Sequence, residues 1–277
     1  MSQVSVNTNY GALLALQNLN KTNQELADVQ NRINSGFKVA TAKDNGATFA
    51  IAQAMRGKVA GYGVAQSTLD KAISTVDVTL AAGNTLSDLL NEMKQKATAA
   101  RDPSLTTAQR AAYNADFVQL RDAISRTVSN AEFNGANMIK ASGQNVVAFA
   151  NDTGSSLITL TAVSFALSGA TVTVTTTDKV DTFTNAGLAL TRVNASITAL
   201  NKQLATLGSG SRALEKHRSF LAQLSDSLEA GIGNLVDADM AKESAKLQSL
   251  QVKQQLGAQA LSIANQSPQI LLRFFQS

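Results

Sequence analysis

The sequence is poor in the residue types that build compact catalytic sites. Its 277 residues include no cysteine, no tryptophan and a single histidine. The lack of cysteine excludes disulfide bonds, thiolate nucleophiles and cysteine metal sites. The histidine, His217, leaves almost no material for a metal centre or a Ser/His/Asp triad. Its place between Lys216 and Arg218 indicates a solvated helix residue. We therefore expect no enzymatic activity, no metal and no cofactor.

Charge and long apolar runs are also scarce. Charged residues make up 16% of the chain, and the net charge is +4. The two signs are interspersed, so no dense basic stripe is available for phosphate contacts, and a nucleic-acid-binding coiled coil is disfavoured. No apolar run reaches the length of a membrane span. The polar start, Met1–Asn9, does not resemble a secretory signal peptide, so export from a bacterial cell would need a route without a cleaved signal.

The N-terminal part predicts two helices joined by a connector. Apolar and small residues at alternating spacings of four and three predict a helix over 11–36. They are Ala15, Leu19, Thr22, Leu26, Val29 and Ile33. Small and polar residues over 36–46 predict the connector. A second stripe, which includes Leu69, Ile73 and Val76, runs over 49–100 and is long enough to indicate a coiled coil.

A helical hairpin and a strand-rich insert follow. Asp102-Pro103 ends the second helix, because proline disfavours helical geometry in the residue before it. Thr106 and Gln109 predict a capping box for a third helix that ends near Asn130. Asn134-Gly135 signals a turn. Alternating segments rich in β-branched residues then predict strands within 146–149, 157–165 and 171–177.

A strict heptad gives the clearest periodicity of the chain and argues for a coiled-coil partner. Its members are Val193, Leu200, Leu207, Leu214, Leu221, Leu228 and Leu235. Gly208-Ser209-Gly210 lies inside the heptad and favours a kink. With Ala213 it matches a dinucleotide fingerprint by chance, since no strand precedes it.

The C-terminal residues predict a last helix. Asp237 or Asp239 can cap its start, which explains these carboxylates better than acid–base catalysis does. Its stripe comprises Val252, Leu256, Ala260 and Ile263. The helix is expected to end near Pro268, before an apolar tail that contains Leu271 and would be a binding element if exposed.

These patterns together predict a mainly α fold, a long helical coiled-coil bundle formed by the N- and C-terminal segments with a small β-rich insert in the middle. Segment 193–235 is expected to pack on 49–100. The stripes of the two ends are expected to lack intrachain partners of matching length. Such narrow stripes would be ordered by packing in a polymer, so we expect the ends to drive self-assembly.

Several motifs resemble the bacterial flagellins. The connector reads Asn34-Ser35-Gly36-Phe37-Lys38-Val39-Ala40-Thr41-Ala42-Lys43-Asp44-Asn45. It resembles the family's N-terminal signature, Ser-Gly-Leu-Arg-Ile, two residues, then Ala-Lys-Asp-Asp. Other segments are similar to the family's post-hairpin turn and C-terminal region: Glu132-Phe133-Asn134-Gly135, Leu235-Val236-Asp237-Ala238-Asp239, Gln255-Leu256-Gly257 and Ala264-Asn265-Gln266-Ser267-Pro268-Gln269. The resemblance covers about 1–141 and 187–273, not the insert.

The resemblance implies a structural subunit of the flagellar filament for motility, with a hook-filament junction protein as the alternative. The implied partners are further copies of the chain, the flagellar export apparatus, a chaperone, the filament cap and the junction proteins, and the implied location is extracellular. The expected domains are a filament-core helix over 1–34, a connector over 35–48, rod segments over 49–140 and 187–236, the insert over 141–186, and a second filament-core helix over 237–277.

Two residue sets follow from these stripes. The expected assembly interface comprises Leu19, Leu26, Ile33, Val252, Leu256, Ile263 and Leu271. The expected rod packing comprises Leu69, Ile73, Val76, Val193, Leu200, Leu221 and Leu228.

One segment departs from the family. In flagellins detected by the Toll-like flagellin receptor, the first long helix carries an Arg-Val-Arg-Glu-Leu-Ala core. The matching residues are Glu92-Met93-Lys94-Gln95-Lys96-Ala97. Glu92 reverses a charge, Gln95 loses one, and Lys96 places an ammonium where an apolar side chain is expected. We therefore expect weak or absent binding to this receptor.

Overall fold

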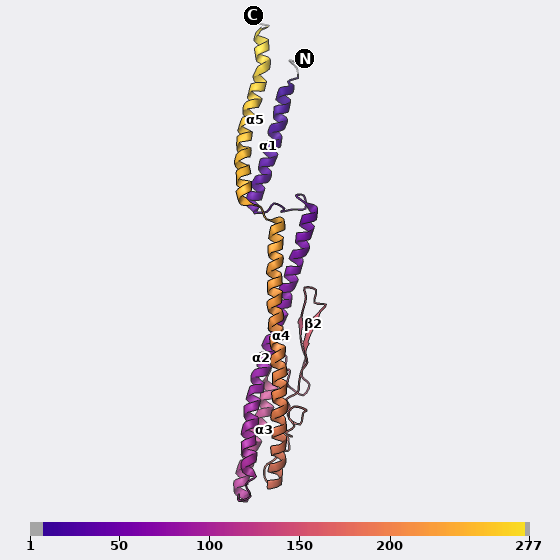
Figure 1. Cartoon of the computed structure of the whole chain (residues 1–277), viewed down its shortest axis with the longest axis vertical. Helices are drawn as coiled ribbons and strands as arrows, with labels where there is room; N and C mark the ends of the chain where they lie inside the picture. The colour runs from indigo at the N-terminus through magenta and orange to yellow at the C-terminus, as the bar shows by residue number, and fades with distance from the viewer. Residues whose placement is uncertain (1–7, 275–277) are drawn as a thin grey trace. The chain divides into compact units, whose positions relative to one another are not determined.

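The structure, a computed structural model, describes residues 8–274, with side chains up to residue 266. Within this part the elements are α1 (Tyr10–Ser35), α2 (Gly46–Ala100), α3 (Thr107–Asn130), β1 (Val146–Phe149), β2 (Leu157–Leu160), α4 (Phe183–Val236) and α5 (Met240–Phe274) (Figure 1). The expected mainly α fold with a small β-rich insert is confirmed. The chain forms two compact units, Met1–Gly57 with Leu228–Ser277, and Lys58–Ser227.

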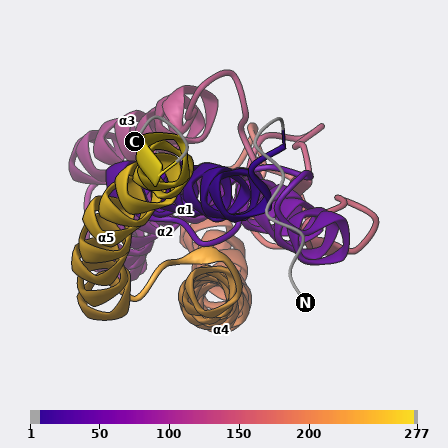
Figure 2. The same ribbon diagram turned by 90° about the horizontal axis from the view of Figure 1, so that it is seen from above.

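In the first unit, α1 and α5 lie side by side (Figures 1 and 2). Asn9 caps α1, since its side-chain oxygen accepts a hydrogen bond from the Ala12 N–H at 3.0 Å. Gly36 ends the helix with a φ of 75°, a left-handed conformation that suits glycine. Its N–H donates to the Arg32 carbonyl at 2.8 Å. The Asn9 cap therefore explains where the expected helix begins, and Gly36 explains where it ends and the connector starts.

One antiparallel register runs along the α1–α5 seam. Polar contacts mark both ends and the middle: Asn9 Nδ2 to Ala264 O at 2.7 Å, Gln254 Nε2 to Asn23 Oδ1 at 2.7 Å, and Arg32 Nη1 to Glu243 Oε1 at 3.5 Å. Between them, a Cβ added to Gly257 would lie 3.3 Å from a methyl carbon of Leu19. The expectation that the stripe of α1 lacks an intrachain partner is wrong, because α5 packs on this stripe along its length.

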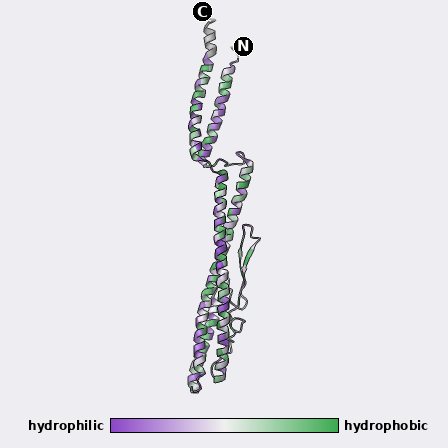
Figure 3. Cartoon of the chain, viewed as in Figure 1, coloured by the Kyte–Doolittle hydropathy of each residue, from purple (hydrophilic) through white to green (hydrophobic). Residues whose placement is uncertain are grey.

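In the second unit, parts of α2, α3 and α4 share one apolar core (Figure 1). Its largest buried side chains include Leu69, Leu90, Phe117, Leu200 and Leu221. Figure 3 shows apolar residues recurring along each helix among polar ones, as amphipathic packing requires. The expected capping box is present, with Thr106 Oγ1 accepting from the Gln109 N–H and Gln109 Oε1 accepting from the Thr106 N–H.

The insert forms a two-stranded antiparallel sheet. β1 pairs with β2, with Val146 opposite Leu160 and Phe149 opposite Leu157. The predicted turn precedes this hairpin, and both Asn134 and Gly135 have positive φ.

The strand expected at 171–177 is wrong. This segment carries one isolated bridge, between Leu167 and Val172. Two of its N–H groups instead bond to side chains, with the Thr173 N–H donating to Ser196 Oγ and the Thr175 N–H to Asp178 Oδ2. These bonds replace a strand ladder.

Gly208-Ser209-Gly210, where a kink was expected, lies inside α4, which continues through these residues. A Cβ added at Gly210 would collide with the side chain of Leu160 on β2. The missing side chain therefore lets the hairpin approach the helix, at the cost of about 1 kcal/mol of helix propensity.

Gly61 and Gly63 on α2 form a matched pair for testing how the hairpin docks. A Cβ at Gly61 would collide with the backbone carbonyl of Asp152, whereas a Cβ at Gly63 would meet nothing within 4 Å. Gly61→Ala is expected to destabilise the protein by about 1–3 kcal/mol through this collision. Gly63→Ala is expected to stabilise it by about 0.5–1 kcal/mol through helix propensity. Urea unfolding measures both, and equal shifts of the same sign would contradict this docking.

The expectation that the last helix ends near Pro268 is wrong as well, because α5 continues to Phe274. Proline lacks an N–H, so the carbonyl four residues earlier, that of Ala264, has no donor within the helix. Asn9 Nδ2 donates to this carbonyl. This hydrogen bond from α1 replaces the one that proline cannot donate, so the missing bond no longer favours ending the helix here.

Candidate assembly surfaces

The expected assembly residues of α1 lie within the intrachain seam. Leu19 contacts α5 beside Gly257, and Leu26 and Ile33 are half-buried on the same helix face. Val29, between them, is buried. These residues therefore hold the two terminal helices together in one chain.

The expected assembly residues of α5 face the other way. Val252, Leu256 and Ile263 are 55%, 58% and 69% exposed. The side chains that α5 turns toward α1 are different, and include Leu250, which is buried, and Gln254. Residue Leu271 lies outside the described side chains. The α5 stripe is thus an outward apolar face, called here the outer α5 face: Val252, Leu256 and Ile263.

Sequence reasoning missed a second outward apolar cluster, at the start of α1. Its members are Tyr10, Leu13, Leu14 and Leu16, which are between 43% and 74% exposed. The signal was present, as four large apolar residues fall within seven consecutive positions. The prediction followed the stripe at spacings of four and three, and these four residues do not belong to that stripe. They are called here the α1 start cluster.

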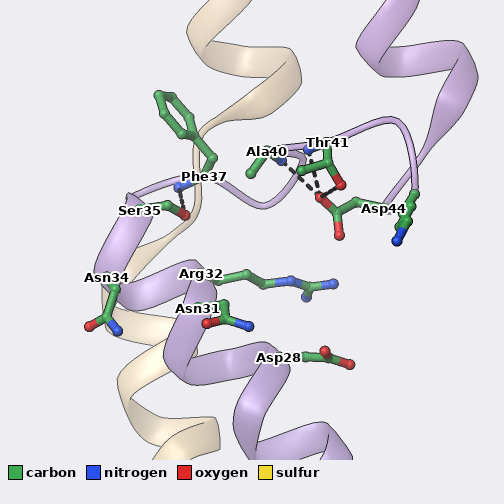
Figure 4. A pocket seen from close by; sticks show the side chains of 10 residues that line it. Asp28, Asn31, Arg32, Asn34, Ser35, Phe37, Ala40, Thr41 and Asp44 are labelled. Carbon is green, nitrogen blue, oxygen red and sulfur yellow. Dashed lines mark hydrogen bonds between the residues drawn. The ribbon is translucent and has the colours of Figure 1, made fainter.

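The connector lies against the end of α1 and lines a hollow of about 870 Å³ (Figure 4). Asp44 organises it, because Oδ2 of this residue accepts hydrogen bonds from the N–H groups of Ala40 and Thr41 and from Thr41 Oγ1. The bond from the Thr41 backbone, above all, lowers the pKa of Asp44 below its ordinary value. The turn is therefore stabilised above the ordinary pKa of an aspartate and loosens as pH falls through the lowered one.

The connector also pairs with the residues that join α4 to α5. Phe37 and Asp237 form an antiparallel bridge. The Lys38 N–H donates to the Val236 carbonyl and the Ala238 N–H to the Gly36 carbonyl, each at 2.8 Å. The signature-like segment thus fixes where α1 ends against the start of α5.

Asp239 caps α5 as expected. Its Oδ1 accepts from the N–H groups of Ala241 and Lys242, each at 3.1 Å. Within the described residues no cluster of three or more His, Cys, Asp or Glu side chains is suited to hold a metal ion. No helix in that part of the chain is both long and apolar enough to cross a membrane.

His217 is not a solvated residue, contrary to expectation. Its Nε2 lies 2.9 Å from the Ala150 carbonyl, and its ring lies 5.9 Å from that of Phe220. The side chain is half-buried between α4 and the hairpin. Because the acceptor is distant in sequence, the charged neighbours of His217 gave no sign of it.

The residues of the receptor departure lie on the second unit. Glu92 and Gln95 are exposed on α2. Lys96 Nζ forms an ion pair with Asp116 of α3 at 2.7 Å. The hydrogen bond to Asp116 raises the pKa of Lys96 above its ordinary value, so the ammonium stays charged at this position.

Most of the expected rod residues are buried in the second unit. Leu69, Val76, Val193, Leu200 and Leu221 are buried, and Ile73 packs half-buried against their cluster in the second unit. Leu228 belongs to the first unit and is half-buried. The paired long helices and the two outward apolar clusters are features of a helical structural protein that associates with copies of itself.

Comparisons with known proteins identify the family. Residues 6–144 match the bacterial flagellin N-terminal helical region, and residues 190–275 match the bacterial flagellin C-terminal helical region. The chain is 50% identical to flagellin FljK and 49% identical to flagellin FljM of Caulobacter vibrioides, over the full length of each. It is 35% identical to a flagellin of Brucella melitensis, covering 98% of this chain and 99% of that protein.

A solved structure supports the same fold. The crystal structure of Bacillus cereus flagellin superposes with a TM-score of 0.50 at 22% identity, covering 56% of this chain and 88% of that one. The chain belongs to the bacterial flagellin family and is a structural subunit that polymerises into the flagellar filament. Nothing in the comparisons favours a hook-filament junction protein.

Proposed function

We propose that neighbouring subunits contact one another in the filament through the outer α5 face and the α1 start cluster. The single observation that carries this proposal is the exposure of Val252, Leu256 and Ile263 on a helix whose opposite face already packs on α1. Full burial of one such side chain contributes on the order of 1.5–3 kcal/mol. A set of them repeated in every subunit supports a long polymer.

The remaining parts of the function follow from family membership. We propose that the chain leaves the cell through the flagellar export apparatus with a chaperone, and meets the filament cap and the junction proteins at the extracellular filament. Its role is structural rather than catalytic. Seeded polymerisation followed by electron microscopy tests whether the purified chain assembles into filaments. A purified chain that stays monomeric when fragments of its own filaments are added as seeds would contradict the structural role.

The ion pair with Asp116 keeps a charged ammonium at Lys96, where the receptor-activating pattern has an apolar residue. We propose that depolymerised protein activates the Toll-like flagellin receptor weakly, because Glu92, Gln95 and Lys96 meet an interface suited to the other pattern with charge repulsion and desolvation. Each mismatch contributes about 1–3 kcal/mol. Glu92→Arg with Gln95→Glu and Lys96→Leu is expected to restore activation in part.

A reporter assay with depolymerised protein measures this effect. Asp116, which loses its partner in the triple variant, is exposed, so the rod keeps its fold and circular dichroism should be unchanged. Activation by the unaltered chain that equals a strong agonist at the same concentration would refute the proposal.

A further inference from the structure

The seam between α1 and α5 contains one backbone carbonyl that lacks the usual hydrogen bond from its own helix. α5 runs as a helix from Met240 to Phe274, and Pro268 lies inside it. Because proline has no N–H, the carbonyl of Ala264 receives no hydrogen bond from four residues further on. The chain has two prolines, and the other, Pro103, lies outside α5. No other carbonyl of α5 is deprived in this way.

The side chain of Asn9 meets this need from the other helix. Its Nδ2 donates to the Ala264 carbonyl at 2.7 Å, while its Oδ1 accepts from the Ala12 N–H at 3.0 Å. Both ends of one amide are therefore used, one to cap α1 and one to satisfy α5. Aspartate could cap but not donate, and serine is too short to do both.

Near this end the seam includes close contacts made by small residues, which select a register weakly. A Cβ added at Gly11 would lie 3.9 Å from the Cβ of Ala264, and Gly257 lies against Leu19. Sliding one helix along the other would exchange one set of small contacts for another. A polar contact at this end can then help to fix the register, together with the contacts of Gln254 with Asn23 and of Arg32 with Glu243, as polar residues do in coiled coils.

We propose that Asn9 is a register lock for the terminal helix pair, acting on the carbonyl that Pro268 leaves without an intrahelical donor. A shift by one helical turn would place a carbonyl with its own intrahelical donor opposite Asn9 and leave Ala264 unpaired. The lock thus holds the α1 start cluster and the outer α5 face at one relative position. Only this last consequence rests on the proposed contacts between subunits.

An engineered disulfide reports the register in the monomer. The natural chain has no cysteine, and the 3.9 Å separation at Gly11 and Ala264 is within the range that disulfides span. We expect the full-length double variant Gly11→Cys with Ala264→Cys to form an intramolecular disulfide under mild oxidation. Gly11→Cys with Ala260→Cys, about one turn away, should oxidise about tenfold more slowly.

A double-mutant cycle then separates the lock from simple capping. In the Gly11→Cys, Ala264→Cys protein, Asn9→Ser keeps a capping oxygen but loses the donor to Ala264, and should slow oxidation about tenfold. Pro268→Ala gives the Ala264 carbonyl an intrahelical donor. In that background Asn9→Ser should change the oxidation rate by less than about twofold.

Equal slowing by Asn9→Ser in both backgrounds would show that Asn9 acts as a helix cap alone and would overturn the proposal. No slowing in either background would overturn it too. Circular dichroism of each variant verifies that α1 and α5 remain helical. Since every measurement uses monomers, failure of filament assembly would leave the result readable.

Discussion

Filaments are expected to be absent when Leu256 is replaced by aspartate. The side chain of Leu256 is 58% exposed, so the substitution leaves the α1–α5 seam and the folded monomer intact. In the polymer we expect the same position to be covered by a neighbouring subunit. An unpaired carboxylate buried there costs on the order of several kcal/mol per contact, and every subunit carries the change. Sedimentation and electron microscopy after seeding measure the loss.

The adjacent residue supplies a matched control. Gln255 is exposed, and Gln255→Asp introduces the same charge on the same helix without removing an apolar side chain. This variant is expected to polymerise close to the unaltered chain. If Leu256→Asp forms filaments equally well, the outer α5 face is not an assembly surface. If the Leu256→Asp monomer instead loses helix content, Leu256 stabilises the α1–α5 pair within the chain.

Deleting either terminal helix is also expected to abolish filament formation. Removal of 1–33 or of 239–277 takes away one partner of the α1–α5 pair, while the core of the second unit, built from 58–227, is untouched. Each truncated chain is expected to be a soluble helical monomer. Filaments grown from either would show that polymerisation does not depend on the ends.

The buried face of the rod helices could be read from the sequence because its apolar side chains recur at a regular spacing. A side chain that recurs every seven residues marks one helix face wherever the partner lies, and Leu200 and Leu221 are buried as that rule requires. The capping box at Thr106 and Gln109 was equally readable, since both of its hydrogen bonds are local. Local and periodic signals need no knowledge of distant segments.

The seam of the terminal helices was harder to predict because it is built from small and polar residues. On α5, Gly257 and Gln254 face α1, whereas Leu256 between them does not. A search for apolar stripes therefore selects the outward face of α5 and overlooks the residues that pack on α1. Close approach of two helices favours glycine and alanine, which carry little hydropathy signal.

Contacts between distant segments were beyond the sequence for a related reason. The carbonyl of Ala150 that meets His217 and the Asn9 amide that meets Ala264 are separated from their partners by 67 and 255 residues. Neither pair leaves a periodic mark. The segment 171–177 failed similarly, since its alternation suggested a strand, whereas its N–H groups bond to side chains such as Ser196 on α4.

The second large effect is expected in the core of the rod. Leu221 on α4 is 1% exposed and belongs to the cluster that includes Leu69 and Val76 of α2. Leu221→Asp would bury a carboxylate among apolar side chains. Loss of the packing contacts and burial of an unpaired charge together destabilise by on the order of 3–5 kcal/mol. Urea or thermal unfolding of the monomer should show a transition far below that of the unaltered protein.

The neighbouring Phe220 makes the comparison sharp, since it is large, apolar and 54% exposed. Phe220→Asp introduces the same charge one residue away, where water can solvate it. Its main loss is the tilted ring contact with His217, worth about 0.5–1.5 kcal/mol. A small shift for Phe220→Asp beside a large one for Leu221→Asp would establish that α4 packs on α2 through the heptad face. Equal shifts would instead mean that any added charge on α4 destabilises the rod, and the inferred seam would have to be abandoned.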